Sequence, residues 1–342
     1  MTCAKPFTGK IMRGDIVAAE VEKNHVICVY DCAPLHIKTW NNFELWIEDR
    51  AVDLTRSTMR VILRHLGLSS HDSQSAVRYV HGASLTDTFW IKEDSQNLTW
   101  QNVQFLDDGY FRAAIFGDPD LEKKIYSPEL TNIGSFNKGW KLEEGKWILY
   151  KQNSDLEAFS EVFVSKLALE IGINTVEYTY VSDGVVCCEN FARDGWSFEP
   201  AKSVVGVNLD YDFNYETMEK LGLQNAYMNL IFLDAIVRNF DRHEFNYGFL
   251  TNDSGEIHLA PSFDYNLSLF CHGIPKNFQR NDIMVEDFLH LQNRVQHKLP
   301  IVNENKINLA FNHTKLLAKS LGIKFEHVLE FCMNAYNKMR YL

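Results

Sequence analysis

Polar side chains of the kinds that handle phosphate and metal ions gather between residues 239 and 266. Residues 239–246 read NFDRHEFN, and Asp264 follows eighteen residues after Asn246 within the sequence SFDYN. An Asp followed five residues later by an Asn, here Asp241 and Asn246, is the spacing of a kinase catalytic loop, which holds a base and a metal ligand on one turn. Asn amide and Asp carboxylate oxygens are suitable ligands for Mg²⁺. The pattern therefore indicates phosphoryl transfer, which needs metal ligands, a carboxylate near the attacking hydroxyl and a cation over the phosphates.

The sequence around this loop strengthens the prediction. Alone, the spacing is weak evidence, because turns are rich in both Asp and Asn. Here a largely apolar helix, predicted over residues 227–237, precedes the loop, and a predicted strand follows it. Asp234 within that helix is expected to be a buried carboxylate satisfied by hydrogen bonds. His243 is a candidate nucleotide contact, and its alternative role is to hydrogen-bond the backbone and support the loop.

A lysine and a glutamate upstream are candidates to complete such a site. Lys151 ends a predicted strand over residues 147–151, and Glu161 lies in the helix predicted from Asp155 to Gly172. In a kinase, such a pair supplies the cation that binds the phosphates and the carboxylate that orients this cation. The alternatives to these two residues are Lys146, which lies in a turn, and the helix residues Glu157 and Glu170.

A glycine-containing turn upstream of Lys151 is expected to cover the phosphates. It comprises residues 131–138, within a predicted strand, turn and returning strand over residues 130–140, and it contains no G-x-G-x-x-G. Its candidate nucleotide contacts are Asn132, Gly134 and Ser135.

Composition limits the class of protein. The chain has 342 residues, and 45 acidic against 34 basic side chains give a formal charge of −11. An acidic chain gains little from the electrostatics of non-specific DNA binding, so we expect no direct contact with nucleic acid. The seven cysteines form no C-x-x-C pair. No apolar run approaches the ~18 residues of a membrane span, and the N-terminus lacks the apolar core of a signal peptide. The expected location is the cytoplasm.

Patterning along the chain predicts how these residues are positioned. Short strands are predicted near residues 16–18 and 26–30, and helical periodicity over 40–68. Residues 108–190 are expected to form strands, one helix and further strands, and the chain is helical from about 200. This order predicts an N-terminal extension of unknown role over residues 1–105, a β-rich lobe over 106–190 and a mainly helical lobe over 191–342.

The predicted order of the lobes also indicates where a ligand would bind. A crevice between the lobes is the natural ligand site, which adds Glu189 and Phe191 to the candidate nucleotide contacts.

In the N-terminal extension Arg56, Arg60 and Arg64 are spaced four apart on one helical face. We expect this face to be solvated; its alternative role is to meet DNA or an acidic partner.

The motif N-x-D-x-H-x-x-N, the later Asp within S-F-D-Y-N and the segment PELTNIG…KGWK resemble the HipA-like kinases, including the related CtkA group, over roughly residues 80–342. The resemblance implies an α+β, two-lobed, protein-kinase-like fold and the use of ATP and Mg²⁺. By matching motifs it implies Asp241 as catalytic base, Asn246 and Asp264 as Mg²⁺ ligands, and Lys151 as the lysine on the ATP phosphates. Glu161 is then its partner.

The resemblance also implies phosphorylation of Ser or Thr of a protein, with autophosphorylation at Ser135 or Thr131 as a hypothesis. A protein regulator acting through residues 1–105 is a further expectation. Two alternatives stay open. The order D-R-H-x-x-N also resembles phosphoinositide kinases, which would make the chain a lipid or small-molecule kinase. A non-catalytic module that binds nucleotide is the other.

Overall fold

The computed structural model describes residues 6–69, 73–118, 126–280 and 282–340. It divides into two compact units. Unit 1 comprises Met1–Gln152, Glu189–Glu199 and Leu250–Ile257, and unit 2 comprises Asn153–Cys188, Pro200–Phe249 and His258–Leu342. Each unit is assembled from stretches far apart in the chain.

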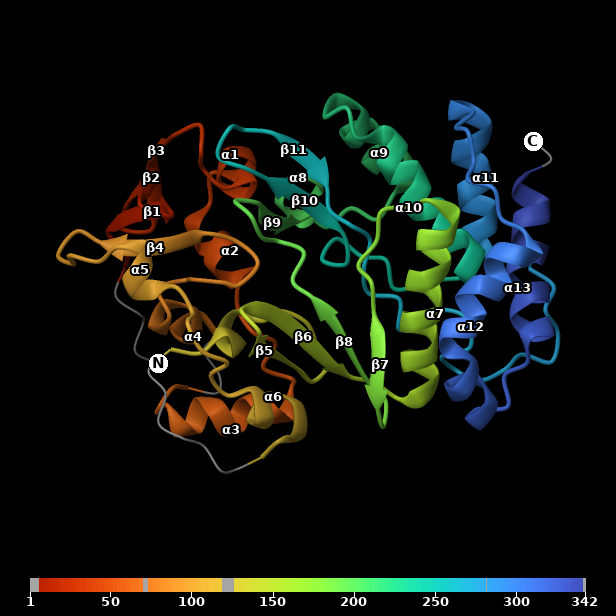
Figure 1. Ribbon diagram of the computed structural model, residues 1–342. Coiled ribbons are helices and arrows are strands. Elements are labelled where there is room, and N and C mark those ends of the chain that lie inside the picture. The colour runs from red at the N-terminus through yellow and green to blue at the C-terminus, as the bar shows by residue number, and fades with distance from the viewer. Residues whose placement is uncertain (1–5, 70–72, 119–125, 281, 341–342) are drawn as a thin grey trace. The chain divides into compact units, whose positions relative to one another are not determined.

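Unit 1 begins with an antiparallel sheet of four strands in the order β3-β2-β1-β4 (Figure 1). The strands are β1 (Gly9–Arg13), β2 (Ile16–Glu22), β3 (His25–Val29) and β4 (Phe89–Glu93). The helices of this part are α1 (Leu35–Trp40), α2 (Phe43–Glu48) and α4 (Ser73–Tyr79). Alternate apolar residues of the strands, such as Ile11 and Phe89, form one core with Phe43 and Trp46 of α2.

A second core of unit 1 lies around α3 (Ser57–His65) and α6 (Phe111–Phe116). Next to it are α5 (Trp100–Val103), the 3₁₀ turn η1 (Pro128–Thr131) and the hairpin of β5 (Lys138–Glu143) and β6 (Lys146–Gln152). Helix α3 contacts α6, and α6 contacts β5. Glu144 and Gly145 both have positive φ values, of 50° and 79°, which is typical of a two-residue hairpin turn whose twist matches the strands. The register sets Lys138 opposite Lys151.

Two predictions for unit 1 are wrong. Residues 130 and 131 belong to a 3₁₀ turn and not to a strand, and helix α6 lies where strands were expected. Pro128, near the start of η1, favours a helical turn because its φ is fixed near the helical value. Ala113, Ala114 and Ile115 are buried in α6, because this short helix fills a core rather than a sheet.

Arg56 also departs from its prediction. The helical periodicity of residues 40–68 breaks into separate helices. Arg56 occupies the position before the first residue of α3 and is only 2% exposed. It therefore does not lie on a solvated basic face, whereas Arg60 and Arg64 are exposed as expected. The reason is that carbonyl groups distant in the sequence accept its hydrogen bonds.

Unit 2 begins with α7 (Asp155–Ile171), whose bounds the sequence predicts correctly. Ser154 and Glu157 form a capping box at its first turn, and Gly172 adopts the left-handed conformation that ends it. The hairpin of β7 (Thr179–Ser182) and β8 (Val185–Glu189) follows. β9 (Ser197–Pro200), β10 (Gly248–Thr251) and β11 (Ile257–Leu259) lie at places where the chain passes from one unit to the other.

The remaining helices described in unit 2 are α8 (Lys202–Val205), α9 (Tyr211–Lys220), α10 (Gln224–Val237), α11 (Ile283–Val295), α12 (Glu304–Ser320) and α13 (Phe325–Met339). All of them except the short α8 belong to one bundle (Figure 1). Helix α10 contacts α9, α11 and α13, and α12 contacts α7. Most of α10 is buried, as its apolar sequence predicts.

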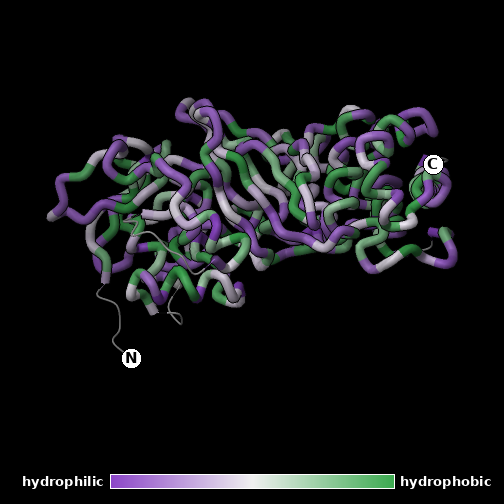
Figure 2. The backbone as a smooth tube through the Cα atoms, turned by 60° about the horizontal axis from the view of Figure 1, so that its bottom comes forward, coloured by the Kyte–Doolittle hydropathy of each residue, from purple (hydrophilic) through white to green (hydrophobic). Residues whose placement is uncertain are grey.

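Hydropathy follows this packing. Figure 2 shows hydrophilic outer loops and elements along which apolar and polar residues alternate. In the described part of the chain, no helix combines the length and the apolar character that crossing a bilayer requires.

Candidate active site

The loop of residues 239–246 is anchored by a buried ion pair. Helix α10 ends at Val237, and Asp234 in its last turn is completely buried. Arg242 donates from Nε to Oδ2 of Asp234 at 2.8 Å and from Nη2 to Oδ1 at 3.0 Å. Such a bidentate pair fixes the guanidinium plane, so the helix end determines the direction in which the loop leaves it. Asp234 is thus the satisfied buried carboxylate that the sequence predicts.

Arg242 also joins this loop to the segment that carries Asp264. Its Nη1 donates to the carbonyl oxygens of Asn246 and of Phe263, the latter at 2.7 Å. The guanidinium also lies over the ring of Tyr265, 5.4 Å from the ring centroid. One side chain therefore holds the main chain beside both candidate metal ligands.

Asn239 forms a second link between the same two segments. Its Nδ2 donates to Oδ1 of Asp234 at 2.9 Å and to the carbonyl oxygen of Asp264 at 3.4 Å. Its Oδ1 accepts from the backbone N–H of Asp241 at 3.4 Å. Because Asn239 is completely buried, these bonds are shielded from water and the position of Asp241 is defined.

Asp241 and Asn246 contact each other directly. The Nδ2 of Asn246 donates to the carbonyl oxygen of Asp241 at 2.8 Å and to its Oδ2 at 3.3 Å. Partial burial raises the pKa of the Asp241 carboxyl above its ordinary value, and the negative charge of Asp264 acts in the same direction. A carboxylate whose proton affinity is raised in this way is suited to accept a proton from a hydroxyl group.

His243 supports the loop. Its Nδ1 accepts from the backbone N–H of Phe245 at 3.2 Å, and its ring lies edge-on to that of Phe245. This is the backbone-bonding role that the sequence offers as an alternative to nucleotide contact.

Asp264 and Glu161 belong to one buried network in unit 2. Asp264 has a φ of 64°, in the left-handed region that non-glycine residues rarely adopt. The next residue, Tyr265, donates its backbone N–H to Oε1 of Glu161 at 3.2 Å, and Glu161 is completely buried in α7. Its rival Glu157 is half-buried in the first turn of the helix and accepts from the backbone N–H of Ser154 at 2.7 Å. Glu157 is thus engaged in capping the helix, whereas Glu161 contacts the segment that carries Asp264.

The side-chain oxygens available here fit Mg²⁺ only if a bound substrate supplies further ligands. Because the amide nitrogen of Asn246 is engaged with Asp241, its Oδ1 is the atom suited to a cation, and Asp264 offers a carboxylate. Within the described residues, no group of three or more His, Cys, Asp or Glu could hold a metal ion. Mg²⁺ commonly binds through one or two protein oxygens together with substrate phosphates. Asn246 and Asp264 therefore fit a metal that arrives with a nucleotide.

The other candidates lie in unit 1. Lys151 is in β6 and is 4% exposed, so a long cationic side chain is held in the interior. Asn132 is buried, whereas Gly134 is half-buried and Ser135 is exposed in the turn that leads into β5. Thr131 is buried, and its Oγ1 donates to the carbonyl oxygen of Ala83 at 2.7 Å.

Glu189 and Phe191 are also in unit 1. The Glu189 carboxylate accepts from Nζ of Lys146 at 3.0 Å and forms an ion pair with Arg193. The half-buried ring of Phe191 packs edge-on against Phe198, with 5.3 Å between the ring centroids. Lys146, the poorer alternative to Lys151, is thus paired near the surface and Lys151 is buried.

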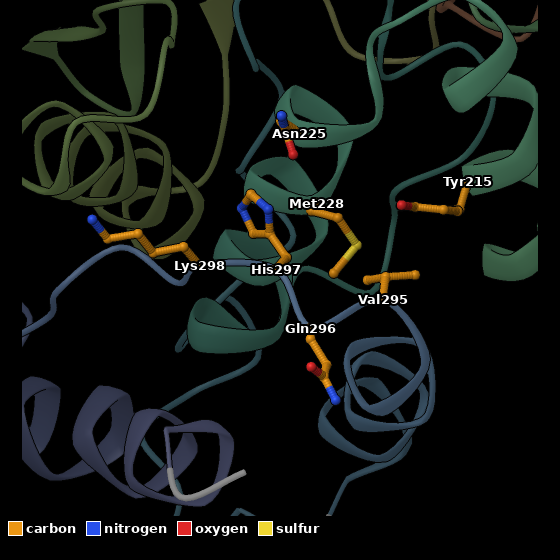
Figure 3. Close-up of a pocket in the computed structure, with 7 residues that line it drawn as sticks. All are labelled: Tyr215, Asn225, Met228, Val295, Gln296, His297 and Lys298. Carbon is orange, nitrogen blue, oxygen red and sulfur yellow. The ribbon is translucent and has the colours of Figure 1, made fainter.

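A cavity of about 440 Å³ lies elsewhere in unit 2. Figure 3 shows Met228, Val295 and His297 between Tyr215 on one side and Lys298 on the other. The His297 ring is fixed by a contact of 2.9 Å between its Nε2 and Oδ1 of Asn229. None of the residues singled out from the sequence lines this cavity, so it is separate from the candidate site.

The sequence reasoning gave no role to Asn239 and Arg242, although both lie within the motif. A signal for them exists: a buried Asp at the end of an apolar helix requires a partner, and Asn239 and Arg242 are among the first side-chain donors downstream, after Arg238.

Comparison with solved structures gives the fold. HipA of Shewanella oneidensis MR-1, solved as a complex with HipB and operator DNA, aligns with a TM-score of 0.60 and 13% identity, over 98% of this chain and 97% of HipA. The chain has a HipA-like fold. The predicted α+β, protein-kinase-like fold class is therefore confirmed. Because the alignment spans 98% of this chain, the likeness extends into the residues before about 80, which the sequence resemblance did not cover.

Two other solved structures align over part of the chain. The proinflammatory kinase CtkA of Helicobacter pylori has a TM-score of 0.42 and 17% identity, over 59% of this chain and 94% of CtkA. The Rio2 kinase of Chaetomium thermophilum, solved as an ADP/Mg²⁺-phosphoaspartate complex, has a TM-score of 0.33 and 13% identity, over 62% of this chain and 70% of Rio2. No protein-family model and no curated protein matches the sequence.

Proposed function

We propose that this protein transfers a phosphoryl group from ATP, with Mg²⁺, to Ser or Thr of a protein. The observation that carries the proposal is the convergence of Asp241, Asn246 and Asp264 in unit 2, held by two buried residues of the same motif. An arrangement that serves only to stabilise the fold has no need for a half-buried carboxylate of raised pKa beside a second carboxylate.

Each residue has a defined role in this proposal. Asp241 accepts the proton of the attacking hydroxyl, and Asn246 and Asp264 bind the metal that ATP brings. Bound Mg²⁺ supplies charge neutralisation at the β- and γ-phosphates. Lys151 binds the phosphates, and Glu161 is its partner. The turn of residues 131–138 covers the nucleotide, with Asn132, Gly134 and Ser135 as contacts.

The intact mass of the purified protein, before and after incubation with ATP and Mg²⁺, tests the proposal. We expect the wild-type protein to gain 80 Da per phosphate, or to transfer phosphate from labelled ATP to a Ser/Thr peptide library. Asp241→Asn is expected to lower the rate about 10²–10⁴-fold, because general-base catalysis contributes on that scale. Asp264→Asn should lower it by weakening the metal site.

Asp94→Asn is the matched control, because Asp94 is exposed in the turn after β4 and has no part in the proposed site. Equal activity in the wild-type protein, Asp241→Asn and Asp264→Asn would overturn the assignment of the site. Transfer to phosphoinositide vesicles but not to peptides would overturn the protein acceptor and favour a lipid kinase.

A further inference from the structure

The turn of residues 131–138 is attached at both ends to residues of the N-terminal 105. At its start, the Arg56 guanidinium donates from Nη2 to the carbonyl oxygen of Asn132. Near its end, the same guanidinium donates from Nη1 to the carbonyl oxygen of Phe136 at 3.4 Å. Two residues further along the chain, Oγ1 of Thr58 donates to Oδ1 of Asn137 at 3.2 Å. All of these groups lie in unit 1.

The buried carboxylate of Glu129 also contacts this turn. Glu129 is completely buried, and its Oε1 accepts from the backbone N–H of Trp140 at 2.9 Å. Its Oε2 accepts from Nδ2 of Asn132 at 3.3 Å. When it is ionised, Glu129 interacts favourably with the charge of Arg56 and offsets part of the cost of excluding water from that cation.

Burial of Arg56 has an energetic cost that a purely structural role does not require. A guanidinium that is 2% exposed loses its hydration, and an apolar side chain at this position would fill the same volume without that loss. Its planar, fixed donors can, however, hold two carbonyl groups at set positions at once. The two carbonyl groups that it holds belong to opposite ends of one turn.

The middle of this turn is open. Ser135 is exposed, and Gly134 has a φ of 108°. A Cβ atom at Gly134 would lie 2.6 Å from Nζ of Lys138, so a side chain here would displace that ammonium group. The ends of the turn are therefore held, while its middle is exposed at Ser135.

We propose that Arg56 is a positioning residue that holds the phosphate-covering turn in its binding conformation. This inference rests on the proposed function. It makes residues 1–105 part of the nucleotide site, because a displacement of the start of α3 would move both ends of the turn. A partner that binds this segment could thereby alter nucleotide affinity.

The test compares Arg56→Gln and Thr58→Val with Arg60→Gln in the full-length protein. Arg60 lies on the same helix, is exposed, and loses the same charge on substitution. Two properties are measured: amide hydrogen exchange in residues 132–138 without nucleotide, and the Kd and KM for ATP·Mg²⁺ together with kcat.

We expect Arg56→Gln to raise exchange in the turn and to weaken ATP binding about tenfold or more, as the loss of hydrogen bonds from a charged group predicts. KM should rise far more than kcat falls, because Arg56 does not touch the reacting atoms. Thr58→Val, which removes one neutral hydrogen bond and tests the attachment if Arg56→Gln does not fold, should act in the same direction by a few-fold. Arg60→Gln should match the wild-type protein in both measurements.

Unchanged exchange and unchanged Kd in both Arg56→Gln and Thr58→Val would overturn the inference. So would a fall in kcat at constant KM, because this would place Arg56 in the chemical step. If the wild-type protein binds no ATP·Mg²⁺, the proposed function fails, and the exchange data alone then decide whether Arg56 holds the turn.

Discussion

Arg242 and Asp234 form a bidentate ion pair, with donor–acceptor distances of 2.8 and 3.0 Å, in the interior of unit 2. Asp234 is completely buried, and the Arg242 side chain is nearly so. The pair joins the last turn of α10 to the loop that carries the candidate base. The position of this loop, and with it the candidate site, therefore depends on the ion pair as the fold does.

Arg242→Gln is expected to destabilise the protein by about 3–5 kcal/mol, because it leaves a buried carboxylate without its charge partner. Urea unfolding of the variant measures this loss. Arg294→Gln is the control: Arg294 pairs with Asp212 at the surface, so its loss should cost no more than about 1 kcal/mol. Equal stability of the two variants would show that the buried pair does not anchor the loop.

Substitution of Glu161 should lower activity, whereas substitution of Glu157 should lower only the stability of the helix. Glu161→Gln keeps an oxygen for the backbone N–H of Tyr265 but removes the charge that Lys151 needs in the proposed site. We expect a loss of turnover of at least tenfold with a change in Tm of only a few degrees. Glu157→Gln should lower the free energy of unfolding by less than about 1 kcal/mol and leave turnover unchanged. The opposite pattern would identify Glu157 as the functional carboxylate.

Autophosphorylation, if the turn is its target, should occur at Ser135 and not at Thr131. Ser135 is exposed, whereas the Thr131 hydroxyl is buried and donates to the carbonyl oxygen of Ala83. Phosphopeptide mapping of the wild-type protein, Ser135→Ala and Thr131→Val distinguishes the two. A phosphate on Thr131 in correctly folded protein would contradict the hydrogen bond described here.

The stability of unit 1 should fall as pH rises through neutrality. Burial raises the pKa of Glu129 to about 7, above its ordinary value of 4.5, so the folded state holds a proton that the unfolded state releases. The stability linked to this proton is fully present below pH 4.5 and is lost as pH rises through 7.

Urea unfolding at pH 5 and pH 8 measures this effect. We expect the wild-type protein to lose on the order of 1–3 kcal/mol more than Glu129→Gln between these values. The variant retains an acceptor for the N–H of Trp140, so the comparison isolates the charge. Equal pH dependence of the two proteins would show that Glu129 is ionised in the folded state throughout this range.

Local signals predicted part of this structure well. The sequence predicts helix α7 from Asp155 and Gly172 at its two ends, because signals for a helix start and stop depend on residues within one turn. The motif around Asp241 likewise depends on residues close in sequence. The choice between Glu157 and Glu161 was open, although the S-x-x-E sequence at 154–157 is a capping-box signal that accounts for Glu157.

Long-range contacts account for what the sequence could not predict. Arg56 is buried because it reaches carbonyl groups 76 and 80 residues away, and no periodicity within its own helix encodes them. Residues 108–131 contain apolar runs short enough for either a strand or a buried helix, and packing against α3 decides for the helix. The proposed roles of all the candidate site residues, those of the Asp241 motif as well as Lys151, Glu189 and Phe191, stay predictions.

Asp264 carries a backbone conformation that glycine adopts without strain and that costs an aspartate about 1 kcal/mol. Asp264→Gly should therefore relax the chain while it removes a candidate metal ligand. Under the proposed function, glycine at position 264 favours thermal stability, whereas aspartate is needed for catalysis. A screen that rewards only heat resistance is thus expected to yield variants at position 264 that outlast the wild-type protein and no longer catalyse.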